Sequence, residues 1–393
     1  MSDVSTIIIL LLLLPAGVVT LMFVAEVLVG LPRPRRGGSR SKAAPRTMII
    51  IPAHDEEAII GRTLEGLAQA GVPGSDILVV ADNCIDATAD VARAAGVRVA
   101  ERQDQQRRGK GFALAFARDV LANDPPDVVI VLDADCATDE RSVGALAHAA
   151  AASGRPVQAI NLLRPDKTAP PLVQISTFAF MLKNLVRQRG LQRLAGRVHL
   201  TGTGMALPWP LFAKARLATA SIVEDIKLGI ELADAGHAPM LVHEANVWSS
   251  PADAAGTLVQ RRRWEGGFLS TMRQAAPPAL MRALRRFDPR GLMAGLDLCV
   301  PPLALLGAIN AGLLLFGVVL TFLLGAGWWP VLLHGGVLLA AASAVLLVWV
   351  REGRSFLAGR ELLKLPLYVL WKLPMYVGLK RKGAPEEWLR TGR

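Results

Sequence analysis

Long apolar stretches most constrain how this 393-residue chain can fold. Residues 7–31 are almost continuously apolar, and two further apolar runs cover about 300–324 and 329–350. At about 1.5 Å per residue, each run is long enough as a helix to cross a hydrocarbon core of roughly 30 Å. Hydrophobic residues make up 52% of the chain and charged residues only 20%. The sequence therefore predicts transmembrane helices at both ends.

Charges around the first apolar run predict its orientation. The preceding MSDVST has no basic residue, whereas a cleaved signal peptide begins with basic residues and has a shorter apolar core. Basic residues follow the run: Arg33, Arg35, Arg36, Arg40, Lys42 and Arg46. By the positive-inside rule, the N-terminus lies outside and the chain after residue 32 lies in the cytoplasm. We expect a retained anchor in a multi-pass protein of a bacterial-type inner (plasma) membrane.

The two later apolar runs predict a transmembrane hairpin, because the GAGWW link between them leaves room only for a turn. Arg351 and Arg354 then return the chain to the cytoplasm. Residues 362–379 are also apolar but contain two lysines and two prolines, so we expect this segment to lie on the membrane instead of crossing it.

The chain between the membrane segments alternates between two patterns. Short apolar strands near 48–51, 77–80, 97–100 and 128–132 alternate with amphipathic helices. This alternation predicts an α/β domain with a mostly parallel, Rossmann-like sheet and helices on both faces. The expected parts are an N-terminal anchor (1–32), a catalytic domain (47–290), a transmembrane hairpin (296–352) and a cytoplasmic or interfacial C-terminal segment (355–393).

Two carboxylates follow the most apolar strand. Asp133 and Asp135 point to the same side if the extended geometry persists through Ala134. Open α/β sheets bind ligands at the carboxyl ends of their strands, and paired carboxylate oxygens are ligands that Mg²⁺ and Mn²⁺ prefer. The plain alternative is a solvated surface turn. Polar clusters at 53–57 and 82–86 also follow strands, which favours a nucleotide site at this edge.

The net charge of +11 does not indicate a nucleic-acid partner. Basic residues are scattered or flank the apolar runs, which fits a membrane surface, and no nucleic-acid-binding signature is present. The three cysteines, Cys84, Cys136 and Cys299, lie far apart without a C-x-x-C pair. Neither a disulfide framework nor a metal–thiolate site is therefore expected.

Six motifs occur in a fixed order: PAHDEE at 52–57, ADNCID at 81–86, GKGFAL at 109–114, DAD at 133–135, ED at 224–225 and QRRRW at 260–264. Each is weakly specific alone, but the ordered series resembles the membrane-embedded family-2 glycosyltransferases. This family includes cellulose, hyaluronan and chitin synthases and the glucosylceramide synthase type. The resemblance covers residues 47–265. It implies a GT-A type catalytic domain that transfers a sugar from a nucleotide sugar, expected to be a UDP-sugar, with inversion.

The resemblance also implies donor-binding residues: Ala53, His54, Glu56, Asp82, Lys110, Asp133 and Arg263. Asp133 and Asp135 would hold a Mg or Mn divalent cation. This cation, Lys110 and Arg263 would neutralise the diphosphate leaving group. Two departures weaken the match: the family more often has Asn at the position of Asp55, and residues 81–84 keep one aspartate of the usual D-D-G-S.

Two motifs, ED and QRRRW, predict the residues that act on the acceptor or contact it. An attacking hydroxyl must lose its proton, and Asp225 is the expected general base, with Glu224 in support. Alternatively, both acids merely stabilise the positive N-terminus of a helix. Gln260 and Trp264 are expected to contact the acceptor, and the glycines at 266–267 predict a flexible loop after QRRRW.

Three functions remain open at this point. The favoured one is a single sugar addition to a lipid-linked or glycolipid acceptor, and the main alternative is a processive polysaccharide synthase. Three spans leave no lumen for a polymer unless subunits assemble, which favours the first. A catalytically silent membrane scaffold is the distant alternative, disfavoured because all four motif aspartates are present: Asp82, Asp133, Asp135 and Asp225. The sequence identifies neither the sugar, the acceptor nor partner subunits.

Overall fold

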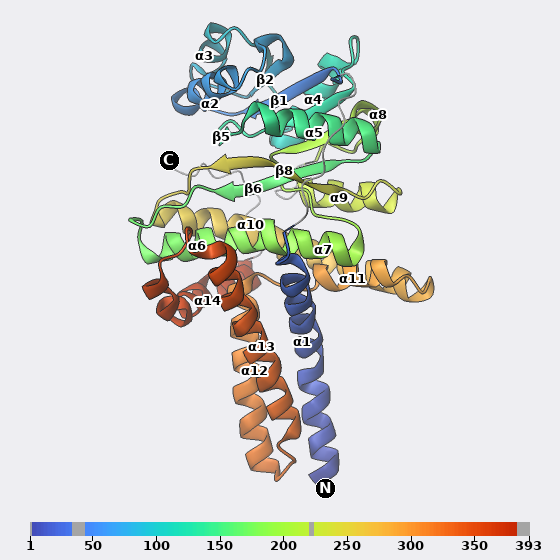
Figure 1. Ribbon diagram of the computed structural model, residues 1–393, viewed down its shortest axis with the longest axis vertical. Coiled ribbons are helices and arrows are strands. Elements are labelled where there is room, and N and C mark those ends of the chain that lie inside the picture. The colour runs from blue at the N-terminus through green and yellow to red at the C-terminus, as the bar shows by residue number, and fades with distance from the viewer. Residues whose placement is uncertain (1, 34–43, 220–223, 383–393) are drawn as a thin grey trace.

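An eight-stranded mixed sheet forms the centre of the α/β part, above a bundle of long helices (Figure 1). The computed structural model describes residues 2–33, 44–219 and 224–382. Most of the basic residues predicted to follow the first span therefore lie outside the described residues. The sheet order is β3-β2-β1-β4-β7-β6-β8-β5. The strands are β1 Thr47–Ala53, β2 Ile77–Asp82, β3 Arg98–Arg102, β4 Val128–Val131, β5 Cys136–Ala137, β6 Val157–Leu163, β7 Met205–Pro208 and β8 Met240–Ser249.

The first half of the sheet is parallel, as predicted. Strand β1 pairs in parallel with β2 and β4, and β2 pairs in parallel with β3. Continuous apolar runs such as the VVIV of β4 suit strands that are buried on both faces. The second half differs from the prediction because β7 is antiparallel to both β4 and β6. The sheet is therefore mixed.

Helices cover both faces of the sheet and form two apolar cores. On one face lie α2 (Glu57–Gln69), α3 (Thr88–Ala94) and α5 (Glu140–Ser153), with Leu64 and Leu146 in the core. On the other face lie α4 (Lys110–Leu121), α8 (Trp209–Lys214) and α9 (Glu224–Asp234), with Leu114, Phe212 and Leu228 in the core. Burial of these side chains fixes the ends of the strands, where the predicted site lies.

A helical layer separates the sheet from the long helices (Figure 1). It contains α6 (Pro171–Met181), the π-helical turn Leu182–Arg187, α7 (Gln188–Ala195), α10 (Ala254–Arg285) and α11 (Pro289–Leu298). The flexible loop predicted at 266–267 is wrong, because α10 runs straight through both glycines and buries them. A helical glycine costs only about 1 kcal/mol relative to alanine, which packing of the surrounding helix can offset.

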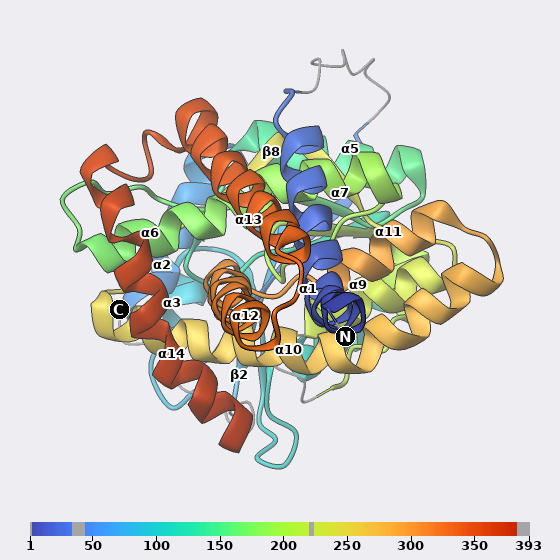
Figure 2. The ribbon, with the colours of Figure 1, turned by 90° about the horizontal axis from the view of Figure 1, so that it is seen from below.

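Four helical segments are long and apolar enough to cross a membrane: Asp3–Gly30, Leu303–Leu324, Trp329–Gly353 and Gly359–Arg381. The first three contain α1 (Ser2–Gly30), α12 (Leu303–Leu324) and α13 (Trp329–Val348), which pack together as the predicted anchor and hairpin. The fourth contains α14 (Leu365–Lys382), which runs across the axis of the other three (Figure 2). That residues 362–379 lie along the membrane instead of crossing it stays a prediction.

The N-terminus lies at the far end of the bundle from the sheet (Figure 1). The turn between α12 and α13 lies at the same end, where the Gly327 amide donates to Thr6 Oγ1 at 2.7 Å. The predicted orientation also puts the N-terminus and the α/β part on opposite sides of the membrane. The compartment that each end faces stays a prediction.

A buried ionic network joins the bundle to the helical layer. Glu26 of α1 is fully buried and accepts a 2.6 Å hydrogen bond from Arg187. Arg187 also donates to Asp297 of α11 at 2.9 Å, and the other oxygen of Asp297 contacts the ring of His199. Breaking a buried charge pair is strongly destabilising, so this network fixes α1 against the layer above it.

Candidate active site

A cavity of about 1320 Å³ lies between the carboxyl ends of the central strands and the helical layer. Every residue that the sequence predicted for the site lines this cavity. These residues are Ala53, His54, Glu56, Asp82, Lys110, Asp133, Asp135, Glu224, Asp225, Gln260, Arg263 and Trp264. The sheet topology and the layer of helices therefore bring together motifs that are far apart in the sequence.

The ends of β1 and β2 form one wall of the cavity. Ala53 pairs in register with Ala81, so the residues that follow the two strands lie side by side. His54 Nδ1 lies 2.7 Å from the backbone oxygen of Asp82. Asp55 adopts a positive φ of 53° and accepts from the Ile85 amide at 2.8 Å. Asp55 thus shapes the loop between β1 and α2.

Asp82 forms a buried ion pair that the sequence analysis missed. Arg102 Nη1 lies 2.6 Å from Asp82 Oδ1, and the Asn83 amide donates to the same oxygen at 3.1 Å. The Arg102 guanidinium also lies over the Phe112 ring, 5.7 Å from its centroid. The strand register explains this ion pair, because Asp82 and Arg102 are direct partners in β2 and β3.

Asp133 and Asp135 converge, but by a turn. Strand β4 ends at Val131, so the predicted extended geometry does not persist through Ala134. One oxygen of each carboxylate and the Cys136 Sγ nevertheless all lie within 4.8 Å of one another. Burial and the nearby Asp133 raise the pKa of the Cys136 thiol to about 11, and its Sγ lies 3.2 Å from the hydroxyl oxygens of both Ser249 and Thr203. The two carboxylates remain, and they suit an oxygen-preferring divalent cation.

Lys110 connects the two acidic groups of the cavity. Its ammonium contacts Asp133 and donates to the Gly202 backbone oxygen at 2.8 Å. Burial alone would lower the pKa of Lys110, but Asp133, Glu224 and Asp225 raise it above its ordinary value. Lys110 is therefore a permanent cation at the centre of the site.

Gly202 allows this close arrangement. Its φ is +80°, and a Cβ at this position would lie 3.3 Å from both Lys110 Nζ and Asp225 Oδ2. Glycine adopts such a conformation without strain. No motif in the sequence predicted this role for Gly202.

Glu224 and Asp225 begin α9 and face the cavity. Burial and the neighbouring Asp225 raise the pKa of Glu224 to about 8. Burial also raises the pKa of Asp225, although the Ile226 amide, Lys110 and Lys183 oppose this effect. A helix N-terminus by itself would lower both values, so burial outweighs it here. A carboxylate with a raised pKa is a stronger base than an ordinary one, which suits proton transfer from a hydroxyl group.

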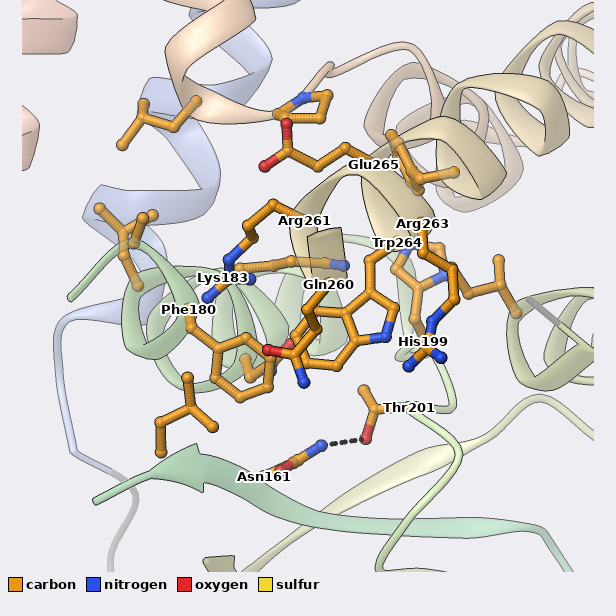
Figure 3. Close-up of a pocket in the computed structure, with 18 of the residues that line it drawn as sticks. Asn161, Phe180, Lys183, His199, Thr201, Gln260, Arg261, Arg263, Trp264 and Glu265 are labelled. Atoms are coloured by element: carbon orange, nitrogen blue, oxygen red, sulfur yellow. Dashed lines mark hydrogen bonds between the residues drawn. The ribbon is translucent and has the colours of Figure 1, made fainter. Parts of the chain in front are cut away.

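Helix α10 presents four residues of QRRRW to the cavity: Gln260, Arg261, Arg263 and Trp264 (Figure 3). Gln260 and Arg263 line it, and the Trp264 ring lies 5.5 Å from the Phe180 ring. Burial lowers the pKa of Arg263, although Asp133 and Glu224 oppose this effect. The ring pair offers an apolar surface next to the acids.

Arg261 has a structural role. Its guanidinium lies 5.2 Å from the centroids of both Phe180 and Trp264 and donates to Ser176 Oγ at 2.7 Å. It is therefore fixed beneath the two rings. Arg262 is exposed and does not line the cavity.

The cavity extends from these polar groups into the helix bundle. Its far wall consists mainly of small and apolar side chains, from Phe23, Leu303, Ala304, Leu306, Gly307, Leu338, Ala341, Val345 and Val369. These residues belong to α1, α12, α13 and α14. A single space thus connects the carboxylates at the strand ends with the segments able to span a membrane.

The mixed α/β sheet, with a cavity at the ends of its central strands, is of the GT-A glycosyltransferase type. Residues 45–267 match the model of the family "Glycosyltransferase like family 2", which is more than half of the chain. The chain therefore belongs to glycosyltransferase family 2, as its motifs predicted.

Two curated relatives match parts of the chain. The probable glycosyltransferase YdaM of Bacillus subtilis is 25% identical over 240 residues, which are 58% of this chain and 56% of YdaM. An uncharacterized protein of Methanocaldococcus jannaschii is 34% identical over 87 residues, which are 22% of this chain and 34% of that protein. The chain thus spans about a third to a half of the length of these relatives.

A solved structure shares the fold over nearly the whole chain. The mannosyltransferase PcManGT from Pyrobaculum calidifontis, in complex with GDP-Man and Mn²⁺, superposes with a TM-score of 0.54. The sequences are 16% identical, and the match covers 95% of this chain and 99% of that one. The similarity therefore includes the helices outside the α/β part.

Proposed function

We propose that this protein is an inverting membrane glycosyltransferase that moves a sugar from a nucleotide-sugar donor to a lipid-linked or glycolipid acceptor. The observation that carries the proposal is the single cavity from the acids at the strand ends to the apolar wall between the long helices. A soluble donor would enter at the strand ends, while the acceptor's tail would remain among the helices. The catalytic domain would face the cytoplasm.

The donor site is proposed on the side of β1, β2 and β4. Ala53, His54, Glu56 and Asp82 would surround the base and ribose, and Asp133 and Asp135 would hold Mg²⁺ or Mn²⁺. A divalent cation there would supply charge neutralisation for the diphosphate. The resemblance favours UDP, whereas the similar mannosyltransferase holds GDP-Man, so both nucleotides should be tested.

The chemistry is proposed to depend on Asp225. Its carboxylate would accept the proton of the acceptor hydroxyl as that oxygen attacks the anomeric carbon, opposite the leaving diphosphate. Lys110 and Arg263 would stabilise the negative charge that develops on the diphosphate. Gln260 and Trp264 would position the acceptor, with Glu224 supporting the base.

We favour a single sugar addition over processive synthesis. A channel for a polymer would need polar side chains within the spans. The main polar residues there are Glu26, Asn310 and His334. Asn310 instead pairs with Thr20 at 3.1 Å, Glu26 pairs with Arg187, and His334 is buried. A silent scaffold is disfavoured because the four motif aspartates line one cavity.

Purified protein in lipid nanodiscs provides the test. It is incubated with UDP- or GDP-sugars and Mn²⁺, and both the released nucleotide diphosphate and glycosylated lipid are measured. We expect nucleotide release that depends on metal and is lost in Asp135→Ala, together with one sugar per lipid. Metal-independent release would refute the metal site, and a long polymer from the protein alone would establish the processive alternative.

A further inference from the structure

Lys183 projects into the middle of the cavity. It lies in the π-helical turn Leu182–Arg187 and is exposed to the cavity, near Gln260 and Trp264 (Figure 3). Its ammonium lies 5.5 Å from the centroid of the Phe268 ring. No motif in the sequence predicted a role for Lys183.

No ion pair between described residues includes Lys183. Two carboxylates interact with it electrostatically, Asp225 and Glu265, but Glu265 already contacts Lys372 and accepts from the Tyr376 hydroxyl at 2.7 Å. Arg187 and Arg261 add further positive charge nearby, and burial lowers the pKa of Lys183. The charge of Lys183 is therefore poorly compensated by the protein.

Three other cations of the cavity have acidic partners. Lys110 contacts Asp133, Arg187 bonds with Glu26 and Asp297, and Lys372 contacts Glu265. Lys183 is instead open to the cavity without an ion pair among the described residues, which favours a ligand that supplies negative charge.

The location of Lys183 indicates which ligand this is. Lys183 lines the same cavity as Asp225, the proposed base, and the apolar rings of Phe180 and Trp264, and it interacts electrostatically with Asp225. An acceptor with its hydroxyl at Asp225 and its tail in the bundle would place its headgroup against Lys183. We propose that the acceptor carries an anionic group, a phosphate or a carboxylate, which binds Lys183. This inference rests on the proposed transferase function.

A different role would also explain the position. The charge of Lys183 lowers the pKa of Asp225, so Lys183 could serve only to keep the base ionised. That role would affect every acceptor equally and would move the acid limb of the pH–rate profile to higher pH when Lys183 is replaced. Anion binding would affect charged acceptors alone.

The test compares matched lipids that differ in charge. Phosphatidylglycerol is paired with diacylglycerol, and glucuronosyl diacylglycerol with glucosyl diacylglycerol, so that phosphate and carboxylate are distinguished. Equilibrium binding to the full-length protein in detergent and sugar transfer are both measured. Lys183→Met should weaken binding of at least one anionic lipid by about 10- to 100-fold, the value of a charge-assisted hydrogen bond, and leave neutral lipids nearly unchanged. Lys183→Arg should retain most of the binding.

Lys167→Met is the matched control, because Lys167 is exposed and does not line the cavity. Equal affinity of the parent protein for charged and neutral lipids would overturn the inference, as would an equal loss for both after Lys183→Met. Transfer to neutral lipids in that case would leave the proposed function standing. Transfer to no lipid at all would count against the proposed function, while the binding data would still decide the role of Lys183.

Discussion

At the residue scale, the site depends on opposite charges close to Gly202, namely the ammonium of Lys110 and the carboxylates of Asp133 and Asp225. Lys110 contacts Asp133 on one side and lies near Asp225 on the other, and Gly202 separates them. The proton affinity of the acidic pair is set by this arrangement, because burial raises both pKa values and Lys110 opposes the rise. Small changes here should affect turnover more than folding.

Asp225→Asn should abolish sugar transfer while leaving donor binding intact. The amide keeps the size of the side chain but cannot accept a proton, and loss of a general base costs about 10²- to 10⁴-fold in rate. Transfer rates and the affinity for the nucleotide diphosphate are measured together. Asp119→Asn, at an exposed position, is the control. A mutant rate equal to that of the parent at saturating donor would remove Asp225 from this role.

Glu224→Gln should reduce the dependence of thermal stability on pH. The folded protein holds a proton on Glu224 up to about pH 8, whereas the unfolded chain releases it near the ordinary value of 4.5. The parent protein should therefore lose stability as pH rises from about 4.5 to about 8, because only the unfolded chain releases this proton over that range. Thermal melts across this range should show a shallower decline for the variant. Parallel declines would contradict the raised pKa.

Gly202→Ala should lower transfer strongly. The new methyl group would lie 3.3 Å from Lys110 Nζ and Asp225 Oδ2, in addition to the strain of a positive φ. Gly236→Ala is a matched control, because Gly236 also has a positive φ of 89° but no neighbour within 4 Å of an added Cβ. Both variants should lose about 1–2 kcal/mol of stability, and only Gly202→Ala should lose activity. Equal activities would show that the crowding is harmless.

Site residues that belong to a sequence motif could be predicted. Residues that reach the site only because of how the chain folds could not. The ordered motifs predicted Asp133, Asp225 and Trp264 as site residues, and all three line the cavity. Arg102 and Lys183 belong to no recognised motif. Their importance follows from strand register and from the direction of a helical turn, which single-residue patterns do not contain.

At the element scale, α1 packs closely against the helical layer at two glycines. An added Cβ at Gly30 would lie 2.0 Å from the Val186 backbone oxygen, and one at Gly190 would lie 2.0 Å from that of Glu26. The two backbones therefore cross with no room for side chains. This crossing holds the Glu26–Arg187 pair in place.

Gly30→Ala should separate α1 from the π-helical turn and destabilise the protein. The backbone must move because a carbonyl oxygen cannot give way as a flexible side chain can, and overpacking typically costs about 1–3 kcal/mol. Thermal unfolding in detergent measures the effect. Gly312→Ala, in α12, is the control because nothing lies within 4 Å of its added Cβ. A Gly30→Ala melt that matches the control would show that the helices adjust freely.

Local patterns predicted most elements, and long-range pairing explains where they failed. The apolar strands and the helices between them appear close to the expected positions. The antiparallel pairing of β7 depends on a return of the chain across the sheet, which periodicity does not show. The glycines at 266–267 suggested a loop, but α10 packs along its whole length and keeps them helical.

At the scale of the whole molecule, the cavity crosses the boundary between the α/β part and the bundle. Sequence reasoning treated the two as separate domains joined by interfacial helices. The wall formed by α1, α12, α13 and α14 depends on how these helices pack beneath the sheet, so the sequence could not predict a continuous space. This continuity favours an acceptor that is partly within the membrane.

The most direct measurement of the central claim follows one labelled sugar. Parent protein and Asp225→Asn are placed in nanodiscs with lipid acceptor, Mn²⁺ and a nucleotide sugar labelled in the sugar, and the lipid products are separated and weighed by mass spectrometry. We predict a lipid that is heavier by a single sugar, formed by the parent and absent with Asp225→Asn. Label that stays in free sugar or enters a long polymer, or equal product from both proteins, would contradict the account.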